Sequence, residues 1–430
     1  METLEHVTGP SMQNGALDSP LRVLVLHGRY RSDGPSGENE VVDDEVLLLR
    51  EYGCDVRQVE LQSDDIAGWS RAKKATLPGR VVWSRAGQRT LQAALDEFRP
   101  DVLHVHNTFP QFSPAIFWAA RRNGVGIVHT LHNFRPLCPA GTFLREGKAC
   151  EQCLGRVPLP AVRHGCYRDS RLATLPLATM SAVHDRLGTW QRCVDRFITL
   201  SEFERAKYVE AGWPAEKFRM KFNTVWEQAV PARRAGDAFL CMSRLVPEKG
   251  VDVLLEGWKR AFPDGSPPLH LTASGDSGAE LMERYGRLPG VTFLGHVSRE
   301  ELMTELSAAR AVVVPSRCYE GFPRVIVEAY AARVPVIASR VGSLVELVRD
   351  GETGLHVGMD DVDDMARVLR RFADDPAAGE RMGEEARATY ERLYSPESTM
   401  AGLLGIYREA IASAAQRTGA TIRPGAREQA

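Results

Sequence analysis

The segment that decides the fold is AVVVPSRCYEGFPRVIVEA, which runs from Ala311 to Ala329. Its first four residues, Ala311–Val314, are apolar and predict a short buried strand. Pro315 ends that strand, and Pro323 suits the first turn of the helix predicted by the residues after it. A strand that leads through a loop into a helix is the repeating unit of a parallel α/β sheet.

The same strand-then-helix pattern recurs on both sides of this segment. Short apolar runs predict further strands at Arg22–His27, Cys54–Glu60, Asp101–His106, Gly126–Thr130, Arg196–Leu200, Phe239–Ser243, Leu269–Ala273, Val291–Leu294 and Val334–Ala338. A break near 226–237 separates them into two doubly wound parallel-sheet domains with a cleft between their strand ends. We expect a disordered lead-in at 1–20, domains at 21–230 and 231–395, a last helix at 396–415 and a disordered tail at 416–430.

Composition excludes several classes of protein. Of the 430 residues, 43% are hydrophobic and 26% are charged, which is typical of a globular enzyme. The net charge of −2 gives no basic surplus for general nucleic-acid binding, and no apolar run is long enough to cross a membrane. Residues 1–20 lack the pattern of a signal peptide, so a cytoplasmic protein is expected.

Two carboxylates flank the start of the helix predicted after Gly321. Glu328 follows Glu320 by eight positions, or about 12 Å of helix. The free N–H groups of a first helical turn favour a phosphate, and carboxylates accept hydrogen bonds from sugar hydroxyls. Spacing alone is equally consistent with a capped amphipathic helix whose acids face solvent.

A second segment, CMSRLVPEKG, follows the first strand of the second domain and runs from Cys241 to Gly250. Arg244 and Lys249 lie at the carboxyl end of that strand, where two cations can neutralise a leaving diphosphate. The alternative is an ordinary solvated loop.

Together these segments resemble the retaining glycosyltransferases of family 4, also called glycosyl transferases group 1. SRLVPEKG at Ser243–Gly250 is similar to their SR…KG signature, Glu320-x7-Glu328 to their E-x7-E signature, and DGETG at Asp350–Gly354 to a later turn. The resemblance spans about Leu21 to Ile411. It implies the GT-B fold, a nucleotide-sugar donor held mainly by the second domain, a last helix that crosses back to the first domain, and no metal requirement for catalysis.

The resemblance also implies roles for individual residues. Arg244 and Lys249 would face the donor diphosphate, Glu320 the transferred sugar, and Glu328 the ribose. His132, after a central strand of the first domain, would lie beside the donor sugar, whereas His104 and His106 suggest a structural or acceptor-side role. The remaining donor contacts would come from the backbone of Gly321, Phe322 and Pro323, from Gly275 and Val297 near the base, and from Gly37. The first loop departs from the family's Gly-Gly pattern, since Gly34 and Gly37 are separated by Pro and Ser.

Two motifs raise the question of metals. Asp361-Val-Asp363 has the form of a metal-binding DxD motif, but it precedes a helical run, where acids cap helices. Four cysteines, Cys138, Cys150, Cys153 and Cys166, are spaced C-x11-C-x2-C-x12-C and could close a tetrahedral structural zinc site. The alternative is a loop with small buried thiols.

The segment from Trp69 to Arg89 contains basic residues and two tryptophans but no acid. This composition has two interpretations. The segment is either a solvated helical face, or a surface that contacts a membrane or an anionic lipid-linked acceptor.

The sequence therefore predicts a retaining glycosyltransferase that moves a sugar from a nucleotide donor, UDP being favoured over GDP, to an acceptor hydroxyl in polysaccharide, glycolipid or glycoconjugate synthesis. A GT-B sugar-nucleotide epimerase is the first alternative, and a non-catalytic two-domain sugar-binding protein is the second. A nicotinamide dehydrogenase is disfavoured because no GxGxxG follows a strand.

Overall fold

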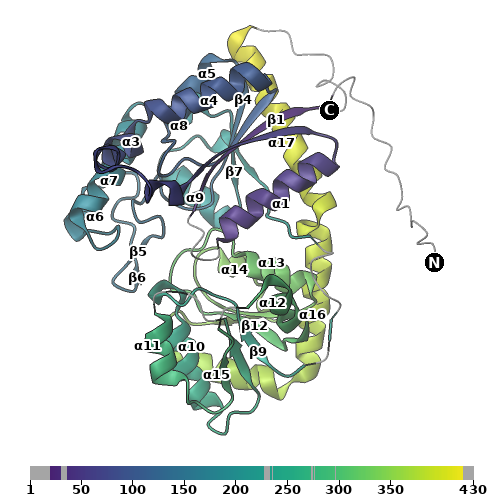
Figure 1. The fold of residues 1–430 in the computed structure, drawn as a ribbon. Helices are drawn as coiled ribbons and strands as arrows, with labels where there is room; N and C mark the ends of the chain where they lie inside the picture. The colour runs from purple at the N-terminus through teal and green to yellow at the C-terminus, as the bar shows by residue number, and fades with distance from the viewer. Residues whose placement is uncertain are drawn as a thin grey trace, which may run out of the picture.

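The computed structural model describes residues 20–30, 36–226, 233–234, 236–272, 275, 277–295 and 297–419. Six parallel strands form the first sheet in the order β2-β1-β3-β4-β7-β8 (Figure 1). The central strands are buried almost throughout, because helices cover both faces of such a sheet. The strands are β1 (Arg22–Arg29), β2 (Asp55–Gln62), β3 (Val102–Asn107), β4 (Gly126–Thr130), β7 (Arg196–Thr199) and β8 (Phe218–Met220).

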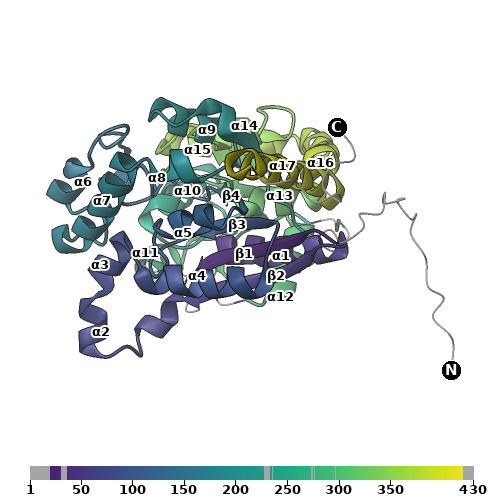
Figure 2. The same cartoon turned by 90° about the horizontal axis from the view of Figure 1, so that it is seen from above.

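The helices of this half alternate with its strands, and a small antiparallel hairpin, β5 (Leu144–Arg145) with β6 (Lys148–Ala149), interrupts the pattern. The helices are α1 (Gly37–Glu51), α2 (Arg71–Ala75), α3 (Leu77–Val82), α4 (Arg85–Phe98), α5 (Ile116–Arg122), α6 (Leu159–His164), α7 (Arg171–Arg186), α8 (Thr189–Cys193) and α9 (Glu202–Glu210). Figure 2 shows α2, α3, α6 and α7 gathered at one side of the sheet.

The second sheet repeats this design with the strand order β11-β10-β9-β12-β13-β14. Its strands are β9 (Phe239–Cys241), β10 (Leu269–Leu271), β11 (Val291–Phe293), β12 (Ala311–Val314), β13 (Val336–Ser339) and β14 (Gly354–Val357). Its helices are α10 (Val251–Ala261), α11 (Gly278–Tyr285), α12 (Arg299–Ala308), α13 (Arg324–Ala331), α14 (Leu344–Leu347), α15 (Val362–Asp374) and α16 (Pro376–Thr389).

The predicted fold of two doubly wound parallel sheets is confirmed. One edge strand in each sheet, β8 and β14, was not predicted from the sequence. Both are short, with three and four residues, and β14 directly follows the DGETG turn. Asp361 accepts a hydrogen bond from the backbone N of Asp364 at 2.9 Å, so the DxD motif caps α15 as predicted.

The last helix, α17 (Pro396–Thr418), follows a π-helical turn at Tyr390–Tyr394 and runs back along the first sheet (Figure 1). It packs on β4, where Gly126 is essential because a Cβ there would lie 2.9 Å from the backbone N of Ile411. Glu409 anchors the helix through ion pairs with Arg196 and Arg219.

The last helix was predicted to end at 415 and to be followed by a tail from 416 to 430. That boundary is wrong, because the helix continues to Thr418. Residues 420–430, residues 1–19 of the lead-in, and residues 227–232 around the predicted domain boundary lie outside the described part of the chain. In the described part, no helix combines the length and apolarity needed to span a bilayer.

The carboxyl ends of the two sheets meet through side chains of the loop after β12. The Tyr319 ring contacts Phe134, Phe143 and Phe203 of the first domain, the last at a centroid distance of 4.7 Å. Glu346 of α14 accepts hydrogen bonds from the first backbone N–H groups of α9, those of Glu202 and Phe203, at 2.9 and 2.6 Å. An acid placed at a helix N-terminus is favourable, so this contact joins the two domains.

Candidate active site

Glu320 and Lys249, predicted from two separate motifs, form an ion pair. Lys249 Nζ donates to Glu320 Oε1 at 2.5 Å, and Ser316 Oγ donates to the same oxygen at 2.6 Å. Burial alone would raise the pKa of Glu320, but the adjacent Lys249 charge and these hydrogen bonds hold it below its usual value. For Lys249, burial is outweighed by Glu320 and the pKa is raised. The site therefore holds one carboxylate and one ammonium at neutral pH.

The loop that carries Lys249 depends on a glycine. Gly250 has φ +64°, and a Cβ there would lie 2.1 Å from the carbonyl oxygen of Pro315. This close approach brings the loop after β9 against the loop after β12, which explains why glycine follows the lysine. Arg244 lies on the same loop, is exposed, and its charge helps to lower the pKa of Glu320.

Glu328, on α13, lies in a network of arginines. Its Oε1 accepts hydrogen bonds from Arg299 Nη2 at 2.6 Å and Arg324 Nε at 2.7 Å. Arg324 also pairs with Asp44 of α1 at 2.7 Å, and both arginines lie 3.5 Å from Glu40. The second predicted carboxylate is thus tied to the first domain, and the sequence analysis did not anticipate either arginine.

His132 lies directly across from the loop after β12. A Cβ on Gly321 would lie 3.0 Å from the carbonyl oxygen of His132, so the two backbones are in close contact. This brings His132 to the same place as Glu320, although the two come from different domains. Burial and the neighbouring His106 lower the pKa of His132 well below its ordinary value, so the ring is neutral at physiological pH.

Behind His132 lies a buried polar network. His106 Nδ1 is 2.9 Å from His132 Nε2, and His106 Nε2 is 3.3 Å from Glu45 Oε1. The other Glu45 oxygen binds the ammonium group of Lys221. Burial raises the pKa of Glu45, but the charges of Lys221 and His104 overcome it and hold the pKa well below its usual value. His106, with its pKa lowered to about 4 mainly by burial, is neutral.

Within the described residues, Glu45, His104 and His106 are the one group of three candidate ligands whose ligand atoms all lie within 4.8 Å of one another. Most of their polar atoms are already engaged, however, although Glu45 Oε1 and His106 Nε2 have no hydrogen-bond partner among the described residues. Lys221 occupies Glu45, and the two ring nitrogens of His104 bond Tyr407 and Thr130, both at 2.7 Å. A cation next to a buried ammonium is unfavourable, so we interpret the group as an internal hydrogen-bond network.

The remaining predicted donor contacts lie in several loops and at helix starts. Gly275 has φ +131° and packs on the backbone of Leu245, whereas Gly37 starts α1 with open space where a Cβ would be. The Phe322 ring is buried against Phe222, and Pro323 caps α13. Val297 is half-buried just before α12. Their roles as donor contacts stay predictions.

Glu204 is a buried carboxyl that the sequence analysis missed. It is 0% exposed, and its Oε1, which has no hydrogen-bond partner, would lie 3.8 Å from a Cβ on Gly321. Burial raises its pKa from 4.5 to about 8. Its sequence context, Ser201-x-x-Glu204, has the form of a helix capping box, which predicts a place in the first turn of α9 but not the burial of the carboxyl.

We expect Glu204→Gln to flatten the pH dependence of stability. Between pH 4.5 and about 8 the folded protein keeps a proton that the unfolded chain has lost, so this group's contribution to stability falls as the pH rises. The variant should therefore gain in unfolding free energy relative to the parent as the pH is raised through this window. Urea unfolding at several pH values measures it, with the exposed Glu202→Gln as control; parallel profiles for parent and variant would contradict the assignment.

The four clustered cysteines come near one another between β4 and α7. All are reduced, and Cys138 and Cys153 are buried. Burial, with smaller contributions from the other three thiols, raises the pKa of Cys153 to about 11. No three of these four described thiols have sulfur atoms mutually within 4.8 Å. A tetrahedral zinc with bonds of about 2.3 Å needs sulfur atoms roughly 3.8 Å apart, so binding would draw them closer. The zinc site stays a prediction.

If these thiols bind zinc, purified protein should contain about one zinc per chain. Chelation should lower thermal stability more than the rate of still-folded enzyme, because metal binding is coupled to folding. Cys153→Ser should abolish zinc content, and Cys318→Ser, outside the cluster, should not. Elemental analysis of reduced protein purified without chelator tests this, and absence of metal would refute it.

The segment that contains these cysteines touches the loop of Glu320. Tyr319 Oη donates to Glu151 at 3.0 Å, and Glu151 also pairs with Lys207 of α9 at 2.8 Å.

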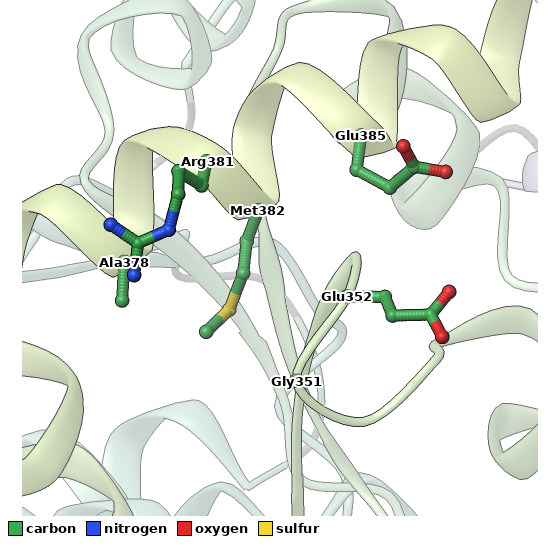
Figure 3. A pocket seen from close by; sticks show the side chains of 6 residues that line it. All are labelled: Gly351, Glu352, Ala378, Arg381, Met382 and Glu385. Carbon is green, nitrogen blue, oxygen red and sulfur yellow. The ribbon is translucent and has the colours of Figure 1, made fainter.

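The hollow drawn in Figure 3, of about 310 Å³, lies away from these residues, between the DGETG turn and α16. None of its lining residues is a predicted site residue. In that turn, Thr353 accepts a hydrogen bond from Tyr330 of α13 at 2.6 Å, so the motif supports the helix that carries Glu328.

Comparison with known proteins agrees with this architecture. Residues 21–223 match the glycosyl transferase 4-like domain, and residues 225–389 match the glycosyl transferases group 1 family. A D-inositol 3-phosphate glycosyltransferase of Mycolicibacterium paratuberculosis is 29% identical over 348 residues, which cover 79% of this chain and 73% of that protein. A glycogen synthase of Mycobacterium tuberculosis is 35% identical over 176 residues, 40% of this chain and 41% of that protein.

Two solved structures share the fold. Sucrose-phosphate synthase from Thermosynechococcus elongatus has a TM-score of 0.64 at 20% identity, covering 91% of this chain and 100% of that one. Anabaena HepE, in complex with UDP and glucose, has a TM-score of 0.61 at 16% identity, covering 90% of this chain and 99% of that one. With both domains matched in order, this chain belongs to the glycosyl transferases group 1 family and is a glycosyltransferase of the GT-B fold.

Proposed function

We propose that this glycosyltransferase moves a sugar from a nucleoside diphosphate sugar to an acceptor hydroxyl with retention of anomeric configuration. The observation that carries the proposal is the convergence of the Lys249–Glu320 pair from the second domain with His132 from the first. UDP is the favoured nucleotide, in keeping with the UDP bound in the HepE structure. The acceptor belongs to polysaccharide, glycolipid or glycoconjugate synthesis.

The second domain stabilises the leaving group in this proposal. The bond between the sugar C1 and the diphosphate oxygen breaks, and its electron pair leaves with the diphosphate. The acceptor oxygen forms its bond to C1 on the same face, and its proton passes to the departing diphosphate oxygen. Lys249, Arg244 and the free N–H groups at the start of α13 supply the positive charge that stabilises the leaving diphosphate. Lys249 stays protonated for this role because Glu320 raises its pKa. Glu320 in turn accepts hydrogen bonds from hydroxyls of the transferred sugar.

His132 orients a hydroxyl in this proposal and does not act as a strong base. Glu45 is ionised and can only accept, so the proton of His106 belongs on Nε2, and His106 Nδ1 accepts from His132 Nε2–H. That leaves His132 Nδ1 as an acceptor for a sugar or acceptor hydroxyl. A pKa well below the ordinary value makes the ring a weak base, so orientation is its main contribution.

Glu328 binds the ribose in this proposal without losing its arginines. Arg299 and Arg324 both use Oε1, so Oε2 is left to accept a ribose hydroxyl. The same arginines contact Glu40 and Asp44 of α1, so ribose binding is coupled to the contact between the domains.

The test is a panel of nucleotide sugars, with nucleotide release measured with and without candidate acceptors and the product anomer assigned by NMR. Glu320→Gln should lower turnover at least about tenfold while changing donor affinity less, because a hydrogen bond to a charged group contributes about 1.5–3 kcal/mol. Glu248→Gln, on the neighbouring loop, is the control. Release that needs no acceptor and yields an isomerised sugar would favour an epimerase, and an inverted product would refute retention.

A further inference from the structure

Five of the ten large apolar side chains that are exposed in the described residues lie in two short segments, 69–83 and 156–180. Leu172 is 83% exposed, Leu159 68%, Val157 60% and Leu175 49%; Trp83 is the fifth. We name these two segments the basic lobe. They are neighbours in space, because α6 and α3 both pack on α7, and Figures 1 and 2 both show this group at the edge of the first domain.

The exposure is not a sign of poor packing. The inner side of the lobe has its own small core, in which Val81 of α3 meets Leu177 and Met180 of α7. On α7, Leu172 and Leu175 are one turn apart on the opposite, outer side of the helix. Ser170 caps α7 by accepting from the backbone N of Ala173, so these leucines begin a well-formed helix.

The lobe is strongly basic in a chain whose net charge is −2. Asp169 is its only acid, and no cation of the lobe forms an ion pair with a carboxylate in the part of the chain that the structure describes. Lys73 and Arg80 instead lie over the Trp69 ring, at 4.2 and 5.1 Å from its centroid. The cations are Arg71, Lys73, Lys74, Arg80, Arg156, Arg163, Arg168 and Arg171.

We propose that the basic lobe docks this enzyme on the surface of an anionic lipid bilayer, with Val157, Leu159, Leu172 and Leu175 inserted among the lipids. The surface of an anionic bilayer has negatively charged headgroups over an apolar acyl-chain region. Exposed aliphatic side chains interspersed with arginines and lysines that form no ion pairs with described residues are complementary to both layers. An acidic protein or a nucleic acid would satisfy the cations but not the leucines. A second copy of this chain would oppose two surfaces of the same charge, which repel.

Docking at this lobe places the membrane next to the candidate active site. Met180 of α7 lines a cavity of about 40 Å³ beside His132. Arg135, three residues after His132, stacks on the rings of Phe109 and of Tyr167, which belongs to the lobe. A hydroxyl presented at a lipid surface would thus approach His132 from the side of the lobe. Docking itself does not depend on the proposed donor chemistry.

Co-sedimentation of the full chain with vesicles tests the proposal. We compare phosphatidylcholine vesicles with vesicles containing about 30% phosphatidylglycerol, at low salt and at about 0.5 M salt. The protein should sediment with the anionic vesicles, and high salt should release part of it. Leu172→Ser with Leu175→Ser should lower the partition coefficient at least about tenfold, because two inserted side chains are lost. Arg163→Gln with Arg171→Gln should weaken binding to anionic vesicles only.

Leu47→Ser is the matched control, since Leu47 on α1 is 50% exposed, like Leu175, but lies outside the lobe. It should bind like the parent, and all variants should keep the parent's thermal midpoint. The proposal is overturned if the parent stays in the supernatant, if the leucine variant binds as well as the parent, or if binding ignores lipid charge. A parent dimer that the leucine variant loses would overturn it in favour of a second copy. None of these outcomes bears on the donor chemistry.

Discussion

Lys249→Ala should lower kcat at least about a hundredfold, because removing one preorganised donor to a developing oxyanion costs about 10²–10³ in rate. The structure adds a second effect. Lys249 is the main group that keeps the pKa of the buried Glu320 low, so its loss should raise that pKa. The acid limb of the pH–rate profile should therefore move to higher pH in the variant.

Calorimetry separates this effect from misfolding. Binding of a nucleoside diphosphate should weaken, whereas binding of the nucleoside should hardly change, because the lost interaction is with phosphate. Lys259→Ala, an exposed lysine on α10, is the control and should retain parental rates. Equal losses for nucleoside and nucleoside diphosphate would indicate damage to the fold and contradict the proposed role of Lys249.

Lys221→Met should destabilise the protein by about 3–5 kcal/mol, the usual cost of leaving one partner of a buried ion pair uncompensated. Lys221 and Glu45 each have side chains only 4% exposed. Without the ammonium, Glu45 must either be protonated or remain as an uncompensated buried charge. Its Oε1 lies 3.1 Å from His104 Nδ1 and 3.3 Å from His106 Nε2, so these contacts change as well.

Chemical unfolding measures this cost, and the double variant Lys221→Met with Glu45→Gln should recover most of it, because no unpaired charge remains. Arg57→Met, which breaks the exposed pair with Glu97, should barely move the unfolding midpoint. If the double variant is as unstable as Lys221→Met, the loss comes from packing and not from the stranded carboxylate.

The sequence alone was sufficient to predict the features that depend on residues close together in the chain. Apolar runs followed by turn residues predict ten of the twelve strands in the two large sheets, since burial and backbone chemistry act over a few residues. The missed strands β8 and β14 are short edge strands, which a run of three or four residues does not distinguish from a loop. The signature residues Lys249 and Glu320 were likewise identified from their own motifs.

The tertiary structure decided the partners of those residues. Glu45 and Lys221 are 176 residues apart, and Tyr407 reaches His104 across 303 residues, so only packing brings them into contact. The arginines at Glu328, the buried Glu204 and the exposed leucines of the basic lobe were missed for the same reason. The fold decides which distant surfaces come together, and this determines whether a charged or apolar side chain is paired, buried or exposed. The neighbouring residues in the chain carry no information about those distant surfaces.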